Sequence, residues 1–414
     1  MANYLAPGVY VKEEPAAVRP IAGVGTSTAA FIGIVPNTVT VPVRANPAFD
    51  PSKPPGPDNQ PAVTETFTLP AAAGQVVECT LFTDFTRAFG DFSTDNGQRR
   101  LAHAVYGFFN NGGSRCYVVR ETAEANISSS ALVKLAAVDD VAIVAAPGIT
   151  TAAVRSAIDT HCRNTEDRFA ILDVQEQLET NGVFDPAELD KSGVLPANSD
   201  VAATYVPWLW VYDPATSLMT PGSDGSLSVP PSGHMAGIYA RVDAARGVHK
   251  APANEVVRGA LDLRYAISRA QQEALNPKGI NAIRTLNGNI RVWGARTIGG
   301  DANADLRYVS VRRLLLFLRE SIDEGLQWVV FEPNDATLWA RITRNVTAFL
   351  TTVWREGALL GTTVAEAFYV KCDAETNPPE VRDRGEVVTE IGVAVVRPAE
   401  FIIFKISQWQ PAAP

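Results

Sequence analysis

The sequence contains few cysteines and no long apolar run, and both features narrow the class of protein. Among its 414 residues, Cys79, Cys116, Cys162 and Cys372 lie far apart without a CxxC pair. This pattern excludes a disulfide framework or zinc ribbon and predicts isolated, mostly buried thiols. No apolar run approaches the roughly 18 residues of a membrane span, and the N-terminal residues lack the features of a secretory signal. We therefore expect a chain that is neither exported by such a signal nor inserted into a membrane.

Motifs of catalysis and of metal or phosphate binding are also missing. The histidines, His103, His161, His234 and His249, form no pair at a metal-ligand spacing. The GxSxG turn of a hydrolase nucleophile and the GxxxxGK[ST] phosphate loop are absent. We therefore expect no catalytic residue, metal or cofactor, and so not an enzyme. Because triads need not be adjacent in sequence, an α/β serine hydrolase that uses His234 with a distant Ser and Asp stays open as an alternative.

Charge is distributed unevenly along the chain. Residues 1–240 contain 14 basic and 25 acidic residues, a net charge of −11, whereas residues 241–414 contain 22 and 20, a net charge of +2. Arginine accounts for 28 of the 36 basic residues, and its guanidinium favours forked contacts with carboxylates. The acidic first part argues against nucleic acid as the main partner. The balanced, arginine-rich part is suited to packing against protein partners.

The first 80 residues have extended and proline-rich patterns. A β-prone run at 9–11 follows the turn signal Pro7-Gly8, and the apolar run 29–35 has the composition of a buried strand. Nine prolines crowd residues 36–75. This density favours polyproline II backbone and blocks ladder hydrogen bonds, so an insertion or semi-rigid surface loop is predicted there.

The middle of the chain alternates between strand and helix patterns. Strands are predicted at 114–120, 141–146, 169–173 and 206–212. Between the second and third of these, Val154, Ile158 and Cys162 recur at helical spacing after a capping threonine at 150 or 151. A strand, a helix and a strand in this order form a βαβ unit, which predicts a parallel sheet.

The last third predicts two long amphipathic helices followed by extended segments. The first helix covers 305–324 and ends at Gly325, with apolar residues at 308, 311, 315, 318 and 322. The second covers 334–356 with Asn334 as its cap, and its apolar stripe lies at 338, 342, 346, 349 and 353. The tail returns to β structure at 387–396 and 401–406.

Eight short motifs occur in an order that resembles one known family. They are PGVYV (7–11), TSTAAFIG (26–33), FTDFTRAFG (82–90), VPPSGHMAG (229–237), APAN (251–254), LNPKGIN (275–281), RVWGART (291–297) and PAEFIIF (398–404). Together they resemble the sheath protein of contractile phage tails and related contractile injection systems. The resemblance runs nearly end to end, with a gap at the proline-rich 36–75.

The resemblance implies a mixed α/β and α+β fold. A central subtilisin-like α/β domain without a catalytic triad is expected at 81–285, and a C-terminal α+β inner domain at 286–414. Residues 1–35 are expected to form an N-terminal arm and a strand that belongs with the inner domain. Residues 36–80 are expected to be the proline-rich insertion or linker. Extended β-arms are expected at both termini.

The resemblance also implies a structural function. The chain is expected to polymerise with itself as hexameric rings around an inner tube protein, with baseplate and terminal cap proteins as further partners. Contraction then drives the tube through a target envelope. The arms expected to add strands to neighbouring copies comprise Val9, Tyr10, Val11 and Lys12 and also Phe401, Ile402, Ile403, Phe404, Lys405 and Ile406. An intrachain hairpin is the alternative for these segments.

Three arginines are the candidate contact with the tube. Arg341, Arg344 and Arg355 lie off the apolar stripe of the second long helix, where they can pair with tube carboxylates. The alternatives are a solvated helix face or salt bridges between subunits. Assembly is expected in the bacterial cytoplasm, as part of a phage tail or a tail-like particle released outside the cell. A baseplate- or cap-proximal sheath variant is the alternative within the same particle.

Overall fold

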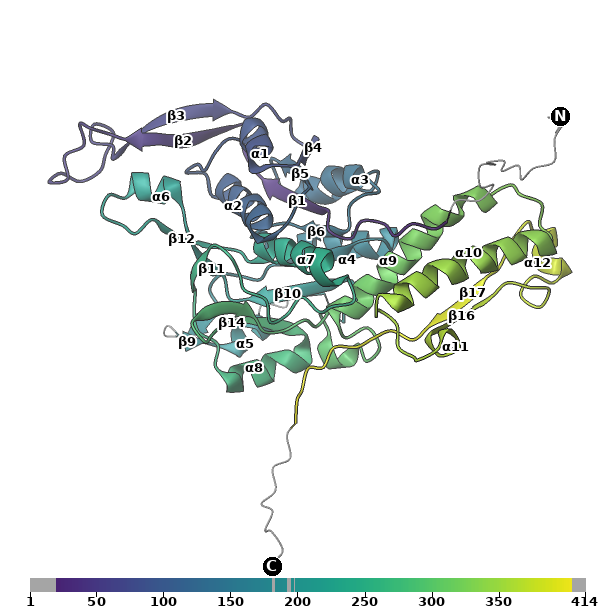
Figure 1. Ribbon diagram of the computed structural model, residues 1–414. Coiled ribbons are helices and arrows are strands. Elements are labelled where there is room, and N and C mark those ends of the chain that lie inside the picture. The colour runs from purple at the N-terminus through teal and green to yellow at the C-terminus, as the bar shows by residue number, and fades with distance from the viewer. Residues whose placement is uncertain (1–19, 181–182, 192–194, 197, 404–414) are drawn as a thin grey trace, which may run out of the picture. The chain divides into compact units, whose positions relative to one another are not determined.

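The computed structural model describes residues 20–180, 183–191, 195–196 and 198–403, which divide into two compact units (Figure 1). Of these residues, 20–23 and 320–394 form the smaller unit, and 24–319 and 395–403 form the larger unit. The division falls within helix α9 (Val309–Leu326), between Arg319 and Glu320. None of the described helices is long and apolar enough to cross a membrane.

The larger unit is built on an eight-stranded sheet with the order β15-β14-β10-β7-β6-β1-β5-β4. The strands are β15 (Asn289–Val292), β14 (Ile280–Leu286), β10 (Ala202–Val206), β7 (Phe169–Ile171), β6 (Ile143–Ala145), β1 (Ala29–Ile34), β5 (Cys116–Glu121) and β4 (Val76–Cys79). The six inner strands run parallel, and the edge strands β4 and β15 run antiparallel to their neighbours. The predicted parallel sheet is therefore confirmed.

Helices cover both faces of this sheet, as the alternating side chains of β1 require. Phe31 packs in a core cluster with residues of α1 (Phe82–Phe89), α2 (Asn96–Asn111) and α7 (Ser232–Arg246). Its neighbour Ile32 packs in a second cluster with residues of α3 (Leu132–Leu135) and α4 (Ala152–Thr165). Val154, Ile158 and Cys162 are buried in that second cluster, which confirms the predicted face of α4.

Shorter elements complete the larger unit. A three-stranded sheet has the order β12 (Ser226–Val229), β11 (Leu209–Tyr212), β13 (Ala260–Leu263), and β8 (Glu179–Thr180) pairs with β9 (Val183–Phe184). The remaining helices are α5 (Pro186–Lys191), α6 (Pro214–Met219) and α8 (Arg269–Leu275). The single strand predicted at 206–212 is wrong: β10 ends at Val206, and β11 starts after Pro207 in a different sheet, because proline has no N–H for the ladder.

The proline-rich stretch, predicted to be an insertion or semi-rigid surface loop without ladder hydrogen bonds, contains a β-hairpin. Strand β2 (Thr38–Ala45) pairs antiparallel with β3 (Ala62–Thr68), and Figure 1 shows this hairpin extending from the larger unit. The prediction failed because six of the nine prolines lie in the 46–61 connection. Pro42 lies inside β2, but the register shifts between Pro42 and Arg44, and both strands are edge strands. Proline is tolerated at edges and bulges.

The smaller unit combines helices with a two-stranded sheet. Helix α10 (Ala336–Arg355) buries Leu338, Ile342, Val346, Phe349 and Val353, which confirms the predicted stripe. The unit also contains the end of α9, α11 (Val364–Ala367), α12 (Pro379–Asp383) and the antiparallel pair β16 (Phe368–Lys371) and β17 (Glu390–Val393).

Both predicted helix boundaries in this region need correction. The N-cap of α10 is Asp335, whose carboxylate accepts the Leu338 N–H at 2.9 Å, rather than Asn334. Helix α9 continues through Gly325 to Leu326. A Cβ at Gly325 would lie 2.6 Å from Ile21, so this glycine permits a close approach of residues 20–23 instead of ending the helix.

The units differ from the predicted domains. Strand β1 lies between β5 and β6 in the larger unit, so residues 29–35 do not belong with a C-terminal domain. Residues 286–319 also belong to the larger unit, where β15 pairs with β14. The described residues from 395 onward return to the larger unit. Pairings between segments far apart in sequence set these boundaries, and such pairings leave no local composition signal.

The prediction of isolated thiols is half correct. All four cysteines are buried and free. Cys79 and Cys116, however, are direct partners in the β4–β5 ladder, although 36 residues separate them in the sequence. The antiparallel register, which sequence spacing does not reveal, brings these two thiols together.

Candidate functional site

The C-terminal arm leaves the larger unit as an exposed apolar segment. Phe401, Ile402 and Ile403 are 70%, 74% and 81% exposed, and no hydrogen bond joins them to another described residue. Three large apolar side chains in a row are costly to expose to water, so this segment is suited to a partner surface. Phe404, Lys405 and Ile406 lie outside the described residues, as do Val9, Tyr10, Val11 and Lys12 of the other predicted arm.

Glu400 fastens the start of this arm to the larger unit. Its carboxylate accepts hydrogen bonds from Arg296 Nη2 at 2.7 Å, Asn276 Nδ2 at 2.7 Å and the Tyr308 hydroxyl at 3.0 Å. The Arg296 side chain is only 4% exposed and also donates to Asp301 at 2.9 Å. Partial burial favours the neutral acid, but the bonds from Arg296 and Asn276 outweigh it and lower the pKa of Glu400. We call these four residues, Glu400, Arg296, Asn276 and Tyr308, the Glu400 clamp.

The smaller unit has open strand edges. Phe368 to Lys371 pair with Val393 to Glu390, and in the described part of the chain no third strand joins either side of this pair. Tyr369, which lies within this ladder opposite Gly392, has an exposed side chain. An edge with unpaired N–H and C=O groups is a template for a strand from another chain. The pair β16–β17 is therefore a candidate acceptor.

The three candidate arginines lie on α10, outside its buried stripe. Arg344 and Arg355 are exposed and Arg341 is half-buried. No ion pair or hydrogen bond links any of them to another described residue. Their charges are therefore available to an acidic partner, whereas many other arginines of the chain already hold carboxylates.

The loop between α9 and α10 contains an exposed aromatic residue that sequence reasoning missed. Phe331 is fully exposed and has a φ of 70°, and its neighbour Val330 is 63% exposed. A bulky residue in this left-handed region costs about 1 kcal/mol or more. Neither feature helps the isolated unit to fold, so this loop is a further candidate contact surface.

His234 of α7 is the histidine of the hydrolase alternative. It is buried against α2, where a Cβ on Gly107 would lie 2.6 Å from its ring. Its Nδ1 is buried without a partner, and no described residue bonds to its ring. Burial, with a smaller contribution from His103, lowers the pKa of His234 to about 3. This histidine therefore packs α7 closely against α2.

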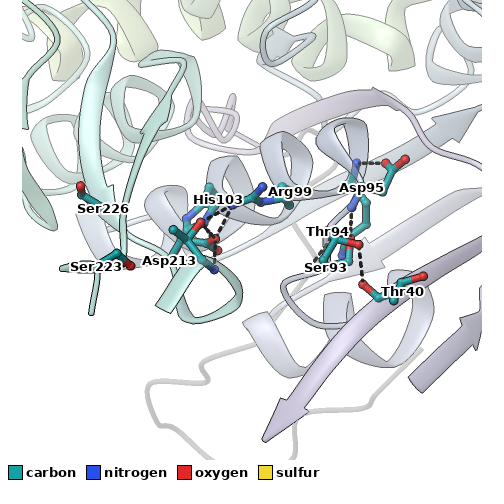
Figure 2. A network of polar contacts seen from close by, with 12 residues as sticks. Thr40, Ser93, Thr94, Asp95, Arg99, His103, Asp213, Ser223 and Ser226 are labelled. Carbon is teal, nitrogen blue, oxygen red and sulfur yellow. Dashed lines mark hydrogen bonds and ion pairs between the residues drawn. The ribbon is translucent and has the colours of Figure 1, made fainter. Parts of the chain in front are cut away.

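A buried network around Asp213 is a polar feature that the sequence did not reveal (Figure 2). Asp213 accepts hydrogen bonds from Arg99 at 2.6 Å and from the Thr216 hydroxyl at 2.6 Å, and it contacts His103 Nε2 at 3.0 Å. Although burial favours the neutral acid, the bonds from His103 and Thr216 and the charge of Arg99 hold the pKa of Asp213 well below its usual value. The network joins the N-terminus of α6 to α2, and no described serine bonds to His103.

A second buried carboxylate, that of Asp173, also accepts several hydrogen bonds. It accepts the Ser232 hydroxyl at 2.5 Å and the Gly148 N–H at 3.0 Å, and burial raises its pKa to about 6. Among the described residues, Ser232 bonds to this carboxylate and to no histidine. Among the residues that the structure describes, no cluster of three or more His, Cys, Asp or Glu side chains is arranged to hold a metal ion.

Comparison with known proteins relates these surfaces to one family. The phage tail sheath protein central domain matches residues 125–298, and the phage tail sheath C-terminal domain matches residues 301–408. The tail sheath protein of Vibrio phage KVP40 is 31% identical over 186 residues, which are 44% of this chain and 26% of that protein. The chain thus aligns with about a quarter of that relative's length.

Two solved structures resemble the chain along nearly its whole length. The sheath complex of an extracellular contractile injection system, PVC, in its contracted state is 27% identical, with a TM-score of 0.73 and 99% coverage of both chains. A chain of the six-fold symmetrised baseplate of the anti-feeding prophage, AFP, is 28% identical, with a TM-score of 0.67 and coverage of 98% of this chain and 100% of that one.

Proposed function

Because the chain belongs to the phage tail sheath protein family, we propose that it is the structural subunit of a contractile sheath in a phage tail or phage tail-like injection system. The likeness to a sheath chain over both units carries this proposal, since it includes the smaller unit and the start of the C-terminal arm. The exposed apolar arm and the open strand edges are features that a self-assembling subunit requires.

In this role, copies of the chain form six-membered rings that stack helically around an inner tube. Baseplate and terminal cap proteins close the two ends, and assembly takes place in the bacterial cytoplasm. The lattice has two packings, an extended one assembled on the tube and a shorter, wider one with more contact between units. Passage from the first to the second drives the tube through a target envelope. Assembly stores the free energy, so the stroke needs no nucleotide.

Strand addition is the proposed link between neighbours. The N-terminal and C-terminal arms of adjacent copies pair with the free edges of β16–β17, which extends this two-stranded sheet into an intermolecular one. About five ladder hydrogen bonds at roughly 0.5–1.5 kcal/mol each stabilise one junction by about 3–7 kcal/mol. The Glu400 clamp sets where the C-terminal arm leaves its own subunit. A β-linked mesh keeps neighbours connected while the compact units move.

We further propose that Arg341, Arg344 and Arg355 bind carboxylates of the inner tube. No described residue forms an ion pair or hydrogen bond with them, which supports this role, and such exposed pairs contribute only about 0–1 kcal/mol each, which suits a tube that must be released. We expect the double variant Arg344→Glu and Arg355→Glu to fold and polymerise normally but to lose tube binding. Co-purification of tube protein with the sheath measures this.

The matched control for this prediction is the pair Arg269→Glu and Arg384→Glu. These exposed arginines already form ion pairs within the chain, with Glu273 and Glu386. Reversal of their charges is expected to leave tube binding unchanged. Equal loss of tube binding in both double variants would mean that general acidity, rather than the α10 arginines, weakens the complex.

The middle of the chain is proposed to be a subtilisin-like domain that has no catalytic role. The parallel sheet with helices on both faces supports this description at the level of architecture. The isolated His234 and the enclosed Asp213 network support a non-enzymatic protein.

Electron microscopy of the purified chain tests the proposed function. We expect helical tubes of sheath diameter, and polymerisation that increases with protein concentration. A chain that stays monomeric at high concentration would reject the proposal. The likeness to an AFP baseplate chain supports one alternative, a baseplate-proximal sheath variant. Copy number per particle separates the two roles, because hundreds of copies indicate the main sheath and six indicate a ring.

A further inference from the structure

Two buried thiols face each other across the edge of the large sheet. Cys79 on β4 and Cys116 on β5 are direct partners in the antiparallel register. Both are completely buried and free. Directly opposite residues of an antiparallel pair have Cβ atoms about 4.5–5.5 Å apart, and a disulfide needs about 3.5–4.5 Å. A shift of about 1 Å is therefore enough to allow a covalent bond.

Strand β4 can make this shift because it is the outermost strand of the sheet. It pairs with β5 on one side, and Val76 and Val77 are only half-buried. Leu81, just beyond its end, is 62% exposed. Local opening of such a short edge strand costs less free energy than global unfolding, and it exposes both thiols to small reagents.

We propose that Cys79 and Cys116 are a built-in disulfide site that closes when the folded chain meets an oxidising small-molecule disulfide, such as oxidised glutathione. In the first step the thiolate of one cysteine attacks the reagent, forms a mixed disulfide and releases one reduced thiol. The second cysteine then attacks the mixed disulfide and releases another reduced thiol. The protein loses two electrons and two protons, and the reagent takes up both.

Oxidation at this site is controlled by opening of the strand. Burial, with a smaller contribution from the neighbouring Cys79 thiol, raises the pKa of the Cys116 thiol, so the closed pair is a poor nucleophile. Once formed, the bond ties β4 to β5 and closes a loop that contains α1 and α2. Such a cross-link restricts the unfolded chain and is expected to raise the melting temperature of the larger unit by about 5 °C. The inference does not depend on the proposed function.

Mass spectrometry of the full chain tests this site. The protein is equilibrated with reduced or oxidised glutathione, also at a temperature just below unfolding, and is then alkylated under denaturing conditions. We expect four alkylated thiols in the reduced sample and two in the oxidised one, with a linked peptide joining Cys79 to Cys116. Four free thiols in both samples, or a link that involves Cys162 or Cys372, would overturn the proposal.

Two alanine variants provide the matched comparison. Cys79→Ala should abolish the link and the rise in melting temperature under oxidation. Cys162→Ala removes an equally buried thiol from α4 and should retain both. If Cys79→Ala fails to fold, the linked peptide of the unmodified chain decides the question alone. A rise in melting temperature that survives in Cys79→Ala would contradict the assignment.

Discussion

Removal of residues 401–414 is expected to abolish sheath polymerisation while leaving the subunit folded. The shortened chain still ends in the Glu400 clamp, and the side chains of Phe401, Ile402 and Ile403 are mostly exposed in the single chain. Loss of about five ladder hydrogen bonds removes about 3–7 kcal/mol per junction, which raises the concentration needed for polymerisation at least about 100-fold. Sedimentation and negative-stain electron microscopy measure the polymer, and circular dichroism measures the fold.

Proline substitution separates backbone pairing from side-chain packing in this arm. Ile402→Pro and Ile403→Pro each remove one N–H, and only one of two consecutive residues directs its N–H toward a given neighbouring strand. One of the two variants should therefore impair polymerisation strongly and the other weakly. Ile402→Val and Ile403→Val keep both the N–H and the apolar side chain and should assemble normally. Tubes from the truncated chain at the normal concentration would refute strand addition by this arm.

Loss of the Glu400 carboxylate is expected to have the second largest effect. Glu400→Ala leaves Arg296 buried with only the half-exposed Asp301 to hold its charge. Breaking a buried ion pair by removing one partner typically costs 3–5 kcal/mol, and the 22% exposure of Glu400 reduces this to about 2–4 kcal/mol. The arm also loses its fixed departure point, so polymerisation should weaken. Urea unfolding and the sedimentation assay measure the two effects.

The same segment offers a matched control for this variant. Arg397 contacts Asp305 at 3.4 Å, with the two side chains 53% and 94% exposed. Arg397→Ala should therefore change the free energy of unfolding by no more than about 0.5 kcal/mol. Glu400→Gln, which keeps a carbonyl oxygen for Asn276 and Tyr308, should fall between the two. If Glu400→Ala and Arg397→Ala prove equally mild, the clamp does not anchor the arm.

Local patterns in the sequence were enough to predict some of the main elements, but not the helices α2 and α7. The stripe on α10 and the face of α4 follow from helical periodicity, because a helix that packs on one side must repeat its apolar residues every three to four positions. Four strands of the parallel sheet, β1, β5, β6 and β7, follow from apolar runs, whereas β10 and β14 were not predicted. The proline-rich hairpin was missed because proline count does not show which prolines fall in the turn and which lie beside a bulge.

Some features of the candidate site could be predicted from the sequence, and others could not. The apolar C-terminal arm and the α10 arginines could be found from sequence, because their composition and spacing are local. The Glu400 clamp joins residues 92 to 124 positions apart, and the Asp213 network joins residues up to 114 apart. Exposure of Phe331 also depends on what surrounds it. A local sequence pattern shows neither which distant residues come into contact nor which side chains are exposed.

By itself, the sequence determined the α/β class, the helices α4, α9 and α10 and the resemblance to the family, because periodic burial and short motifs act over a few residues. The tertiary structure alone decided which charges are partnered. Arg313 lies within the predicted amphipathic helix but is buried against Asp243 at 2.6 Å, whereas Arg344 is exposed and unpaired among the described residues. It also placed Cys79 opposite Cys116. Burial and pairing arise when distant segments meet, so the same residue type becomes a structural ion pair at one position and a free charge at another.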